Sequence, residues 1–467
     1  MADAKRIVVV GGGIAGLAAA RAACLRGRET GRPVSVTVLE GSGRFGGNLL
    51  TEKTEGFLLD AGPDSWVVTK PHATALARTL GLGGSLIETK TENRRYFVAW
   101  GDTLHPVPEG LVLGVPTQLR PLATTNLFTW RGKARMALEP FVSPRRFHGD
   151  DDESIAEFAT RRLGKEAAER LVAPLLGGIS AGDASDISVR AAFPQLVTME
   201  RDYGSLVQGM RVARKARAGG SGSAFTSLEG GTGQLVSTLV DRLRADLVTL
   251  HADRRVDAVA REGGAWAVHT EGGERVIADA VVVAVPAFAA AAMLEGLDDA
   301  LSSALRSIVF GSTATVFLGY RTADVKHPLD GVGFVVPRAA GRPILASTWV
   351  SSKWAGRAPE GHVLLRAFFG GAWGEDVLSH DDEALARVAR TELRTLMGID
   401  AEPVLTRVFR FDKASAQMRV GHLVTMRTLR ERLEAAAPGL RIAGGGYDGV
   451  GIPDSIRQGE EAGRALV

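Results

Sequence analysis

Glycine residues near the start of the chain are spaced for contact with a diphosphate. The hexapeptide GGGIAG, Gly11–Gly16, follows four apolar residues that favour a buried parallel strand and precedes an alanine-rich stretch. We expect Gly11 to permit a tight turn, Gly13 to let phosphates approach the backbone, and Gly16 to let helix and strand pack closely. The phosphates would face the start of a helix, whose dipole and free N–H groups attract negative charge.

A carboxylate and a second glycine turn favour FAD over NAD as the ligand. The predicted strand 34–39 ends at Glu40, where a carboxylate would accept hydrogen bonds from both ribose hydroxyls and repel a 2′-phosphate. A chance glutamate at a strand end is the alternative. The next residues, GSGRFGG at Gly41–Gly47, offer a second backbone approach to the phosphates, and we expect Arg44 to neutralise their charge. Simple NAD enzymes do not need this second loop.

Three further segments are predicted to reach the same cofactor. Gly62–Ser65 follows a short strand and should reach the isoalloxazine, with a plain β-turn as the alternative. Val256 lies in a predicted hairpin, where its backbone would pair with adenine edges or simply with the sheet. Near the C-terminus, RIAGGGYDGVGIPDSIRQGEEAG predicts a strand, a glycine turn and a helix whose N-terminal end would stabilise the anionic reduced flavin. Both ends of the chain should therefore meet at one flavin.

The whole chain excludes several other functions. With 56 Lys and Arg against 53 Asp and Glu, it lacks the basic excess of a nucleic-acid-binding protein. Its single cysteine, Cys24, excludes an intramolecular disulfide, a thiolate metal cluster and a dithiol redox pair, and no metal site is expected. The first residues do not form a signal peptide. The apolar stretch 280–294 is too short to span a membrane, which predicts a cytoplasmic protein.

The order of predicted elements indicates an α/β protein of two or three domains. Residues 1–82 alternate strand and helix in the manner of a parallel sheet, and residues 83–220 are mostly helical. After a Gly/Ser/Ala-rich patch near 218–223, β-rich sequence returns. Strands at 312–320 and 343–370 predict a mixed sheet, and a helix is expected over 382–397.

Essentially the full length of the chain resembles the FAD-dependent porphyrinogen oxidases of haem synthesis, within the wider amine oxidase and phytoene desaturase class. The resemblance is carried by GGGIAGL, LE, GRFGG, GPDS and the closing GVGIPDSIRQGEEAG. Middle segments look closer to the Gram-positive branch, which is similar to coproporphyrinogen III oxidase, whereas the sister branch takes protoporphyrinogen IX. These segments are LHPVPEG (Leu104–Gly110), GISAGD (Gly178–Asp183), the FPQL run from Phe193, APEG and LLRAF (Leu364–Phe368).

The resemblance implies three domains and a reaction. The FAD-binding domain, Rossmann-like and similar to that of p-hydroxybenzoate hydroxylase, would comprise 1–82, 227–290 and 403–467. The mixed-sheet substrate domain would comprise 83–100 and 291–402, and a helical, membrane-facing domain 101–226. Non-covalent FAD would oxidise coproporphyrinogen III to coproporphyrin III by removing six electrons, with dioxygen reduced to hydrogen peroxide. Transfer of the product to a ferrochelatase and peripheral contact with the inner face of the cell membrane are further expectations.

Matching motif positions also imply the site residues, and no protein side chain is expected to be catalytic, because the flavin does the chemistry. The implied FAD contacts are Gly11, Gly12, Gly13, Ile14, Ala15, Gly16, Glu40, Gly41, Asn48, Gly62, Pro63, Asp64, Ser65, Val256, Phe411, Val450, Ile452 and Pro453, to which the phosphate-loop argument adds Arg44 and Gly47. Three departures stand out, at Ser180 (often Tyr), Ala416–Met418 (often Pro-Gln-Tyr) and Ser455 (often Cys). The first two border the expected pocket and bear on substrate preference.

Two residues are predicted to orient the substrate. Lys70, six residues after Asp64, would pair with a propionate, with a solvated surface lysine as the alternative. Gly178 would offer its carbonyl to pyrrole N–H groups, with a helix-breaking turn as the alternative. The stretch 104–144 mixes large apolar and basic residues, and we favour burial as a wall of the substrate domain over exposure as a membrane patch, although both can hold for different faces.

Other proteins of the same architecture remain as rivals. Amine oxidases and carotenoid desaturases share the flavin site, but some amine oxidases tether flavin to a cysteine near the C-terminal turn, where this chain has Ser455. They also tend to carry a lysine on a central strand, and residues 307–320 contain none. Rab GDP-dissociation inhibitors share the architecture without redox chemistry. Intact phosphate glycines at both ends of the chain argue against that reading.

Overall fold

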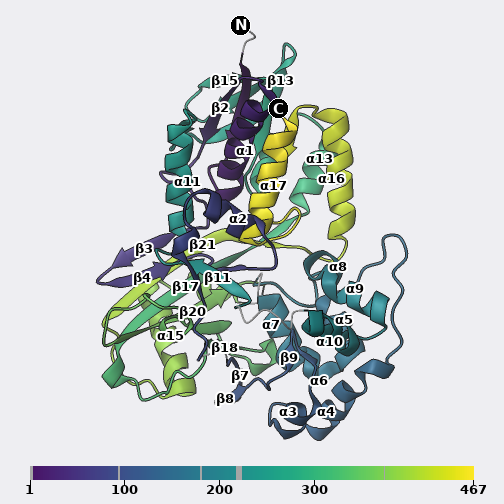
Figure 1. Ribbon diagram of the computed structural model, residues 1–467, viewed down its shortest axis with the longest axis vertical. Coiled ribbons are helices and arrows are strands. Elements are labelled where there is room, and N and C mark those ends of the chain that lie inside the picture. The colour runs from purple at the N-terminus through teal and green to yellow at the C-terminus, as the bar shows by residue number, and fades with distance from the viewer. Residues whose placement is uncertain (1–3, 93–94, 179–180, 217–222, 373) are drawn as a thin grey trace.

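The computed structural model describes residues 4–92, 95–178, 181–216, 223–372 and 374–467. One sheet region holds both ends of the chain, a second sheet region lies beneath it, and a helical region lies beside the second (Figure 1). The predicted α/β class is confirmed. The domain boundaries given above remain a prediction.

A five-stranded parallel sheet forms the first region. Its central strands β1 and β16 are runs of valine and isoleucine over Ile7–Val10 and Val281–Val283, and these residues are buried, as expected for a sheet covered on both faces. In spatial order the strands are β12 (Thr249–His251), β2 (Val34–Leu39), β1 (Lys5–Val10), β16 (Ala280–Val283) and β22 (Leu440–Ile442).

Alternate residues of β1 face two different layers. Ile7 and Val9 pack against one set of helices, α1 (Ile14–Thr30), α2 (His72–Thr79), α11 (Gly233–Ala245) and α17 (Ile452–Ala465). Val8 and Val10 pack against a second layer. That layer contains the antiparallel sheet β13 (Val256–Glu262), β14 (Ala265–Thr270) and β15 (Arg275–Ala278), with helices α12 (Ala287–Met293), α13 (Asp299–Arg306) and α16 (His422–Ala436).

The first and last long helices pack directly on each other, side by side in Figure 1. A β-carbon on Gly459 would lie 2.1 Å from the carbonyl oxygen of Ala15, and one on Gly463 would lie 2.2 Å from that of Ala19. Only glycine at these two positions lets α17 approach the backbone of α1 so closely. This contact brings the C-terminal glycine turn to the N-terminal one.

The second region is a seven-stranded mixed sheet, as predicted. In spatial order its strands are β21 (Leu405–Gln417), β17 (Val309–Arg321), β20 (His362–Gly370), β19 (Ala346–Trp349), β18 (Gly333–Val335), β7 (Phe97–Trp100) and β8 (Thr103–Pro106). Leu365, Ala367 and Phe369 of β20 face a core closed by α15 (Asp382–Met397), the helix predicted at these residues. The alternate residues of β20 therefore face the first region.

Short elements join the two sheets. β3 (Thr51–Thr54) and β4 (Phe57–Asp60) form a hairpin, and β5 (Trp66–Val67), β11 (Phe225–Leu228) and β6 (Leu86–Glu88) form a small sheet. Phe57 and Leu59 of β4 pack with Leu364 of β20 and with Trp354 after the short helix α14 (Val350–Lys353). The turn that follows β4 is thus held between the two sheets.

The helical region has its own core and a buried ionic centre. Arg162, fully buried, pairs with Glu139 and Glu200, and Glu139 also accepts hydrogen bonds from the first amides of the last helix of the region. The elements are β9 (Leu111–Val112), β10 (Val115–Pro116), α3 (Leu119–Thr124), α4 (Trp130–Ala137), α5 (Ile155–Leu163), α6 (Lys165–Ala167), a π-helical turn (Ala168–Val172), α7 (Ala173–Gly177), α8 (Val189–Ala192), α9 (Pro194–Tyr203) and α10 (Leu206–Ala216).

The stretch 104–144 is divided between burial and exposure. Leu122, Phe128 and Met136 lie in the core, so the preference for burial is correct for that face. It is wrong for Trp130 and Phe141, which are 73% and 83% exposed because they project from the outer side of α4 and of the turn after it. Among the described helices, none is long and apolar enough to cross a bilayer.

We predict that Gly459→Val destabilises the protein strongly. The added side chain would overlap the Ala15 carbonyl, and separating α1 from α17 should cost about 3 kcal/mol or more of unfolding free energy. Urea unfolding measures this loss. Gly296→Val is the matched control, because a β-carbon at Gly296 meets nothing within 4 Å. Equal stability of the two variants would contradict the packing described here.

Candidate functional site

The turn after β1 is built for an anionic ligand. Gly11 has a positive φ of 102°, and its β-carbon would lie 2.5 Å from the carbonyl oxygen of Ala284. A β-carbon on Gly16 would lie 1.9 Å from the carbonyl oxygen of Gly11. Gly13 differs, because its β-carbon would meet only the Cα of Gly47, at 3.9 Å. Gly11 thus permits the tight turn and Gly16 the close packing expected of them, and the open space at Gly13 lies where the sequence predicts that phosphates approach the backbone.

The second glycine loop lies directly against the first. The amide of Gly46 donates to the carbonyl of Gly12 at 2.8 Å, and Gly13 and Gly46 form a parallel bridge. α1 begins at Ile14 with Gly13 as its N-cap, and no side chain caps its first amides. The first N–H groups of α1 are free among the described residues, and the space beside them is open because Gly13 and Gly47 have no side chains. This arrangement fits the diphosphate of FAD.

Glu40 ties the two loops together at the end of β2. Its carboxylate accepts hydrogen bonds from the Gly12 amide at 2.7 Å, and from the Ser42 amide and hydroxyl at 2.8 and 2.7 Å. A carboxylate has about four acceptor positions, so Glu40 retains capacity for a ribose hydroxyl. Ser42 was not predicted, and its place two residues after Glu40 is the only sequence signal for it.

Arg44 and Val256 both lie close to the second glycine loop. The Arg44 guanidinium donates to the carbonyls of Gly47, at 2.6 Å, and Leu49, at 3.3 Å, so it fixes its own loop. Its predicted pairing with phosphate remains a prediction. Val256 begins β13, directly after Arg255, whose Cα would lie 3.5 Å from a β-carbon on Gly41.

The turn after β4 is pressed against the segment that ends the second loop. A β-carbon on Gly62 would lie 1.8 Å from the carbonyl oxygen of Asn48. The Asn48 side chain in turn donates to the carbonyl of Ala414 on β21, at 3.1 Å, three residues after Phe411. The structure thus brings Gly62, Asn48 and the Phe411 strand together, as the sequence predicts for the flavin-ring end of the site.

Asp64 has a structural role that the sequence did not reveal. Its carboxylate accepts hydrogen bonds from Lys353 Nζ at 2.9 Å, Trp354 Nε1 at 3.0 Å and the Ser65 hydroxyl at 2.7 Å. Burial by itself would raise the pKa of Asp64, but Lys353 and these hydrogen bonds hold that pKa well below its usual range. With its side chain so engaged, Asp64 would meet a cofactor through its backbone. The carbonyl of Pro63 accepts from the Thr232 hydroxyl at 2.9 Å.

An ion pair joins Lys70 to the C-terminal turn. Asp454 accepts from the amide of Gly451 at 3.3 Å and from Lys70 Nζ at 2.7 and 2.8 Å. Lys70, whose side chain is 52% exposed, is therefore held beside Val450–Pro453 at the start of α17. Lys70 is exposed, as the alternative of a solvated surface lysine has it, but its ammonium group is held by Asp454, and its role towards the substrate stays a prediction. An ammonium group has three N–H donors, so one remains for another acceptor.

Gly178 is the C-cap residue of α7, in the helical region. It is exposed, follows α7 and accepts a hydrogen bond from the Ala181 amide at 3.2 Å, so the turn reading is correct as far as its geometry goes. Ser180 lies outside the described residues. A β-carbon on Gly371 would lie 2.3 Å from the Ala181 carbonyl oxygen, and one on Gly182 would lie 2.1 Å from Gln417.

Ala416–Met418 is the place where these parts meet. A β-carbon on Gly446, in the C-terminal glycine turn, would lie 2.4 Å from that of Ala416. The end of β21 thus contacts both the segment after α7 and the C-terminal glycine turn. Strand pairing places half-buried Phe368 and Ala346 opposite each other nearby, which gives the sheet an apolar face beside the Gly62 turn.

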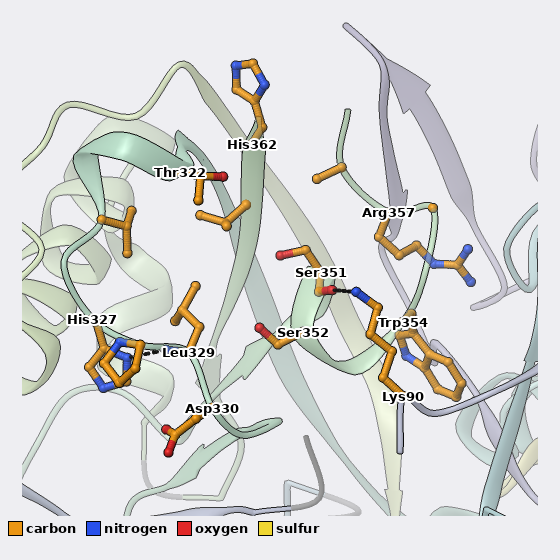
Figure 2. Close-up of a pocket in the computed structure, with 15 residues that line it drawn as sticks. Lys90, Thr322, His327, Leu329, Asp330, Ser351, Ser352, Trp354, Arg357 and His362 are labelled. Atoms are coloured by element: carbon orange, nitrogen blue, oxygen red, sulfur yellow. Dashed lines mark hydrogen bonds between the residues drawn. The ribbon is translucent and has the colours of Figure 1, made fainter. Parts of the chain in front are cut away.

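A cavity of about 440 Å³ is lined in part by Ser351 and Ser352 of α14 (Figure 2). Lys90 donates to the carbonyl of Ser351 at 2.9 Å on its wall, and the Arg357 guanidinium points away from it. None of the residues predicted to contact cofactor or substrate lines this cavity. It is therefore separate from the predicted flavin site.

We predict that Gly13→Val removes FAD without unfolding the protein. The φ of Gly13, −68°, suits valine, and its β-carbon position is clear of other atoms, but the side chain would fill the space left for the diphosphate. The ratio of flavin to protein absorbance should fall by at least tenfold while circular dichroism stays unchanged. A folded Gly13→Val protein with normal flavin content would refute this placement.

Comparisons with known proteins agree with this geometry. Residues 14–467 match the model of the flavin containing amine oxidoreductase family. The chain is 37% identical to "Coproporphyrinogen III oxidase" of Bacillus subtilis (99% of this chain, 98% of the relative) and 27% identical to "Protoporphyrinogen oxidase 2, chloroplastic/mitochondrial" of Arabidopsis thaliana (98% and 93%). A solved structure from Exiguobacterium sp. 255-15 superposes with a TM-score of 0.87 at 32% identity, over 99% of each chain. Cyclohexylamine oxidase from Brevibacterium oxydans, at 17% identity, 99% of each chain and a TM-score of 0.71, shares the fold.

Proposed function

This chain belongs to the flavin containing amine oxidoreductase family, and we propose that it oxidises coproporphyrinogen III to coproporphyrin III with dioxygen as the electron acceptor. It is an FAD-dependent oxidoreductase. Bound FAD would accept hydride from the substrate and pass the electrons to dioxygen, forming hydrogen peroxide. Relatives named coproporphyrinogen III oxidase, similar over nearly the whole chain, support the choice of substrate.

The observation that carries the proposal is the composition of the region where the predicted site residues meet. The Gly62 turn, the Ala416 segment and the C-terminal turn come together beside an apolar sheet face, and Lys70 is the cation held at the start of α17. A porphyrinogen is an apolar macrocycle fringed by carboxylates, and oxidation of its methylene bridges is driven by the aromaticity of the product. Such a substrate needs orientation rather than acid–base catalysis.

The residues of the chain would then orient the substrate and exclude water. Lys70 would direct its remaining N–H to a propionate, which holds the macrocycle at the flavin end of the site. Phe368 and Ala346 would supply the apolar surface beneath it. Among the described residues, the Gly178 carbonyl accepts a hydrogen bond from the Ala181 amide, and its second acceptor position would serve a pyrrole N–H.

Side-by-side assays of the two porphyrinogens test the proposed substrate. We expect faster flavin-dependent turnover of coproporphyrinogen III than of protoporphyrinogen IX, with hydrogen peroxide released in proportion to the porphyrin formed. Preference for protoporphyrinogen IX would move the chain to the sister branch. Turnover of amines with neither porphyrinogen oxidised would overturn the proposal.

We predict that Lys70→Ala lowers kcat/KM for coproporphyrinogen III roughly tenfold or more, since a charge-assisted hydrogen bond would be lost. Lys70→Glu should lower it further through repulsion of the propionates. Flavin content should stay normal in both variants. Lys165→Ala, which removes an exposed lysine of α6, is the control. Unchanged kcat/KM in Lys70→Ala would remove Lys70 from the substrate site.

We also propose that the exposed apolar residues of the helical region contact the membrane surface. Leu119, Trp130, Leu138 and Phe141 project beside Arg120 and Arg131, the combination of side chains that binds at an anionic bilayer interface. A Trp130→Glu, Phe141→Glu double variant should bind vesicles of phosphatidylglycerol and phosphatidylcholine at least tenfold more weakly in a flotation assay. Leu247→Glu, at a 90% exposed leucine of the first region, should change nothing. Equal binding by all three proteins would contradict this proposal.

A further inference from the structure

Five charged side chains are packed behind the Gly62 turn. Asp60, Asp64, Lys353, Arg357 and Arg366 are all buried or nearly so. Two ion pairs account for four of them, Lys353 with Asp64 at 2.9 Å and Arg357 with Asp60 at 3.4 Å. Within the described part of the chain, no carboxylate lies within ion-pair distance of Arg366. We call these five residues the buried charge cluster.

Arg366 bonds directly to the turn. It lies in the middle of β20, on the face towards the first region, and donates to the carbonyl of Gly62 at 2.8 Å and to that of Ala61. Its guanidinium lies between the rings of Phe317 and Phe368, 5.1 and 4.4 Å from their centres. Its Nε has no hydrogen-bond partner among the described residues.

The cluster carries a net positive charge at neutral pH. Burial lowers the pKa of Arg366, opposed by Asp64 and Asp60, but only to about 10, so the guanidinium stays ionised. Burial raises the pKa of Asp60, although Arg357 and hydrogen bonds to its carboxylate oppose this. The raised pKa reduces the negative charge that Asp60 contributes to the cluster. The cluster therefore contains three cations and two carboxylates. The cation without an ion pair among the described residues is Arg366, which bonds to the Gly62 turn.

Burying a guanidinium without a carboxylate at ion-pair distance is costly, and among the described residues its close partners are two backbone carbonyls and two phenyl rings. A methionine or leucine between two phenylalanine rings would avoid the desolvation of a guanidinium. β20 is otherwise largely apolar at its buried positions. The charge is therefore placed at the expense of stability, as at sites where charge serves a reaction.

The bonds from Arg366 also aim an amide donor. The peptide joining Ala61 to Gly62 is trans, so the Gly62 N–H points opposite to the Ala61 carbonyl and away from Arg366. That N–H makes no hydrogen bond within the described residues. Arg366 thus polarises the peptide, and the Gly62 N–H on the opposite side of that peptide is a free donor among the described residues.

We propose that the buried charge cluster, with Arg366 as its main positioning residue, raises the reduction potential of the bound flavin. Reduction adds negative charge to the isoalloxazine, and a fixed positive charge with an oriented amide donor behind the ring would stabilise that charge. This inference rests on the placement of FAD in the proposed function. It does not depend on which substrate the flavin oxidises.

The midpoint potential of the bound flavin in purified holoenzyme tests this proposal. Arg366→Met keeps the length of the side chain between the two rings but removes its charge. The reduction equilibrium should become at least tenfold less favourable, a shift of about 30 mV to more negative potential for a two-electron couple. Arg366→Lys should recover most of the loss. Arg410→Met, at a surface arginine of β21, should leave the potential unchanged.

A second variant separates electrostatics from structural damage. Asp64→Asn removes a negative charge from the same cluster and should shift the potential in the positive direction. An Arg366→Met potential equal to that of the unaltered protein, or shifts of the same sign in Arg366→Met and Asp64→Asn, would overturn the proposal. If Arg366→Met does not retain FAD, the sign of the Asp64→Asn shift decides. Failure to oxidise porphyrinogens would refute the proposed substrate while leaving these potentials measurable.

Discussion

The site depends on how closely the first and last long helices of the chain approach each other. Gly459 and Gly463 leave no β-carbon between α17 and the carbonyls of α1, and within the first turn Gly16 does the same for Gly11. These contacts set the C-terminal glycine turn beside the two N-terminal glycine loops, although most of the chain separates them in sequence. A larger side chain at any of these positions would move one end of the site away from the other.

The two ends of the site use different physical means. The diphosphate end is made almost entirely of backbone, with Glu40 as the side chain that joins the loops. The ring end is held by buried side chains of the second sheet region, which bond to the Gly62 turn from behind through Arg366 and fix Asp64 through Lys353. In the proposed function Phe368, Ala346 and Lys70 face the substrate. The proposals thus place cofactor binding, redox tuning and substrate orientation in separate parts of the structure.

The sequence was sufficient for the features that depend on local spacing. The glycine turns, the place of Glu40 at a strand end, the parallel and mixed sheets and the helix at 382–397 follow from glycine spacing and apolar periodicity, and the structure contains them. Partners distant in sequence could not be derived. Nothing near Asp64 indicates that Lys353 would neutralise it, and Arg366 was visible only as a charge inside an apolar strand. The exposure of Trp130 could not be predicted either, because helical periodicity does not show which face of a helix packs against another element.

Anaerobic mixing of the holoenzyme with coproporphyrinogen III tests the central claim most directly, since it isolates hydride transfer to the flavin from all later steps. The account predicts loss of the oxidised flavin absorbance near 450 nm as the porphyrin spectrum appears, and recovery of the flavin absorbance when air is admitted. A protein that carries stoichiometric FAD but shows no bleaching with coproporphyrinogen III or protoporphyrinogen IX would contradict it.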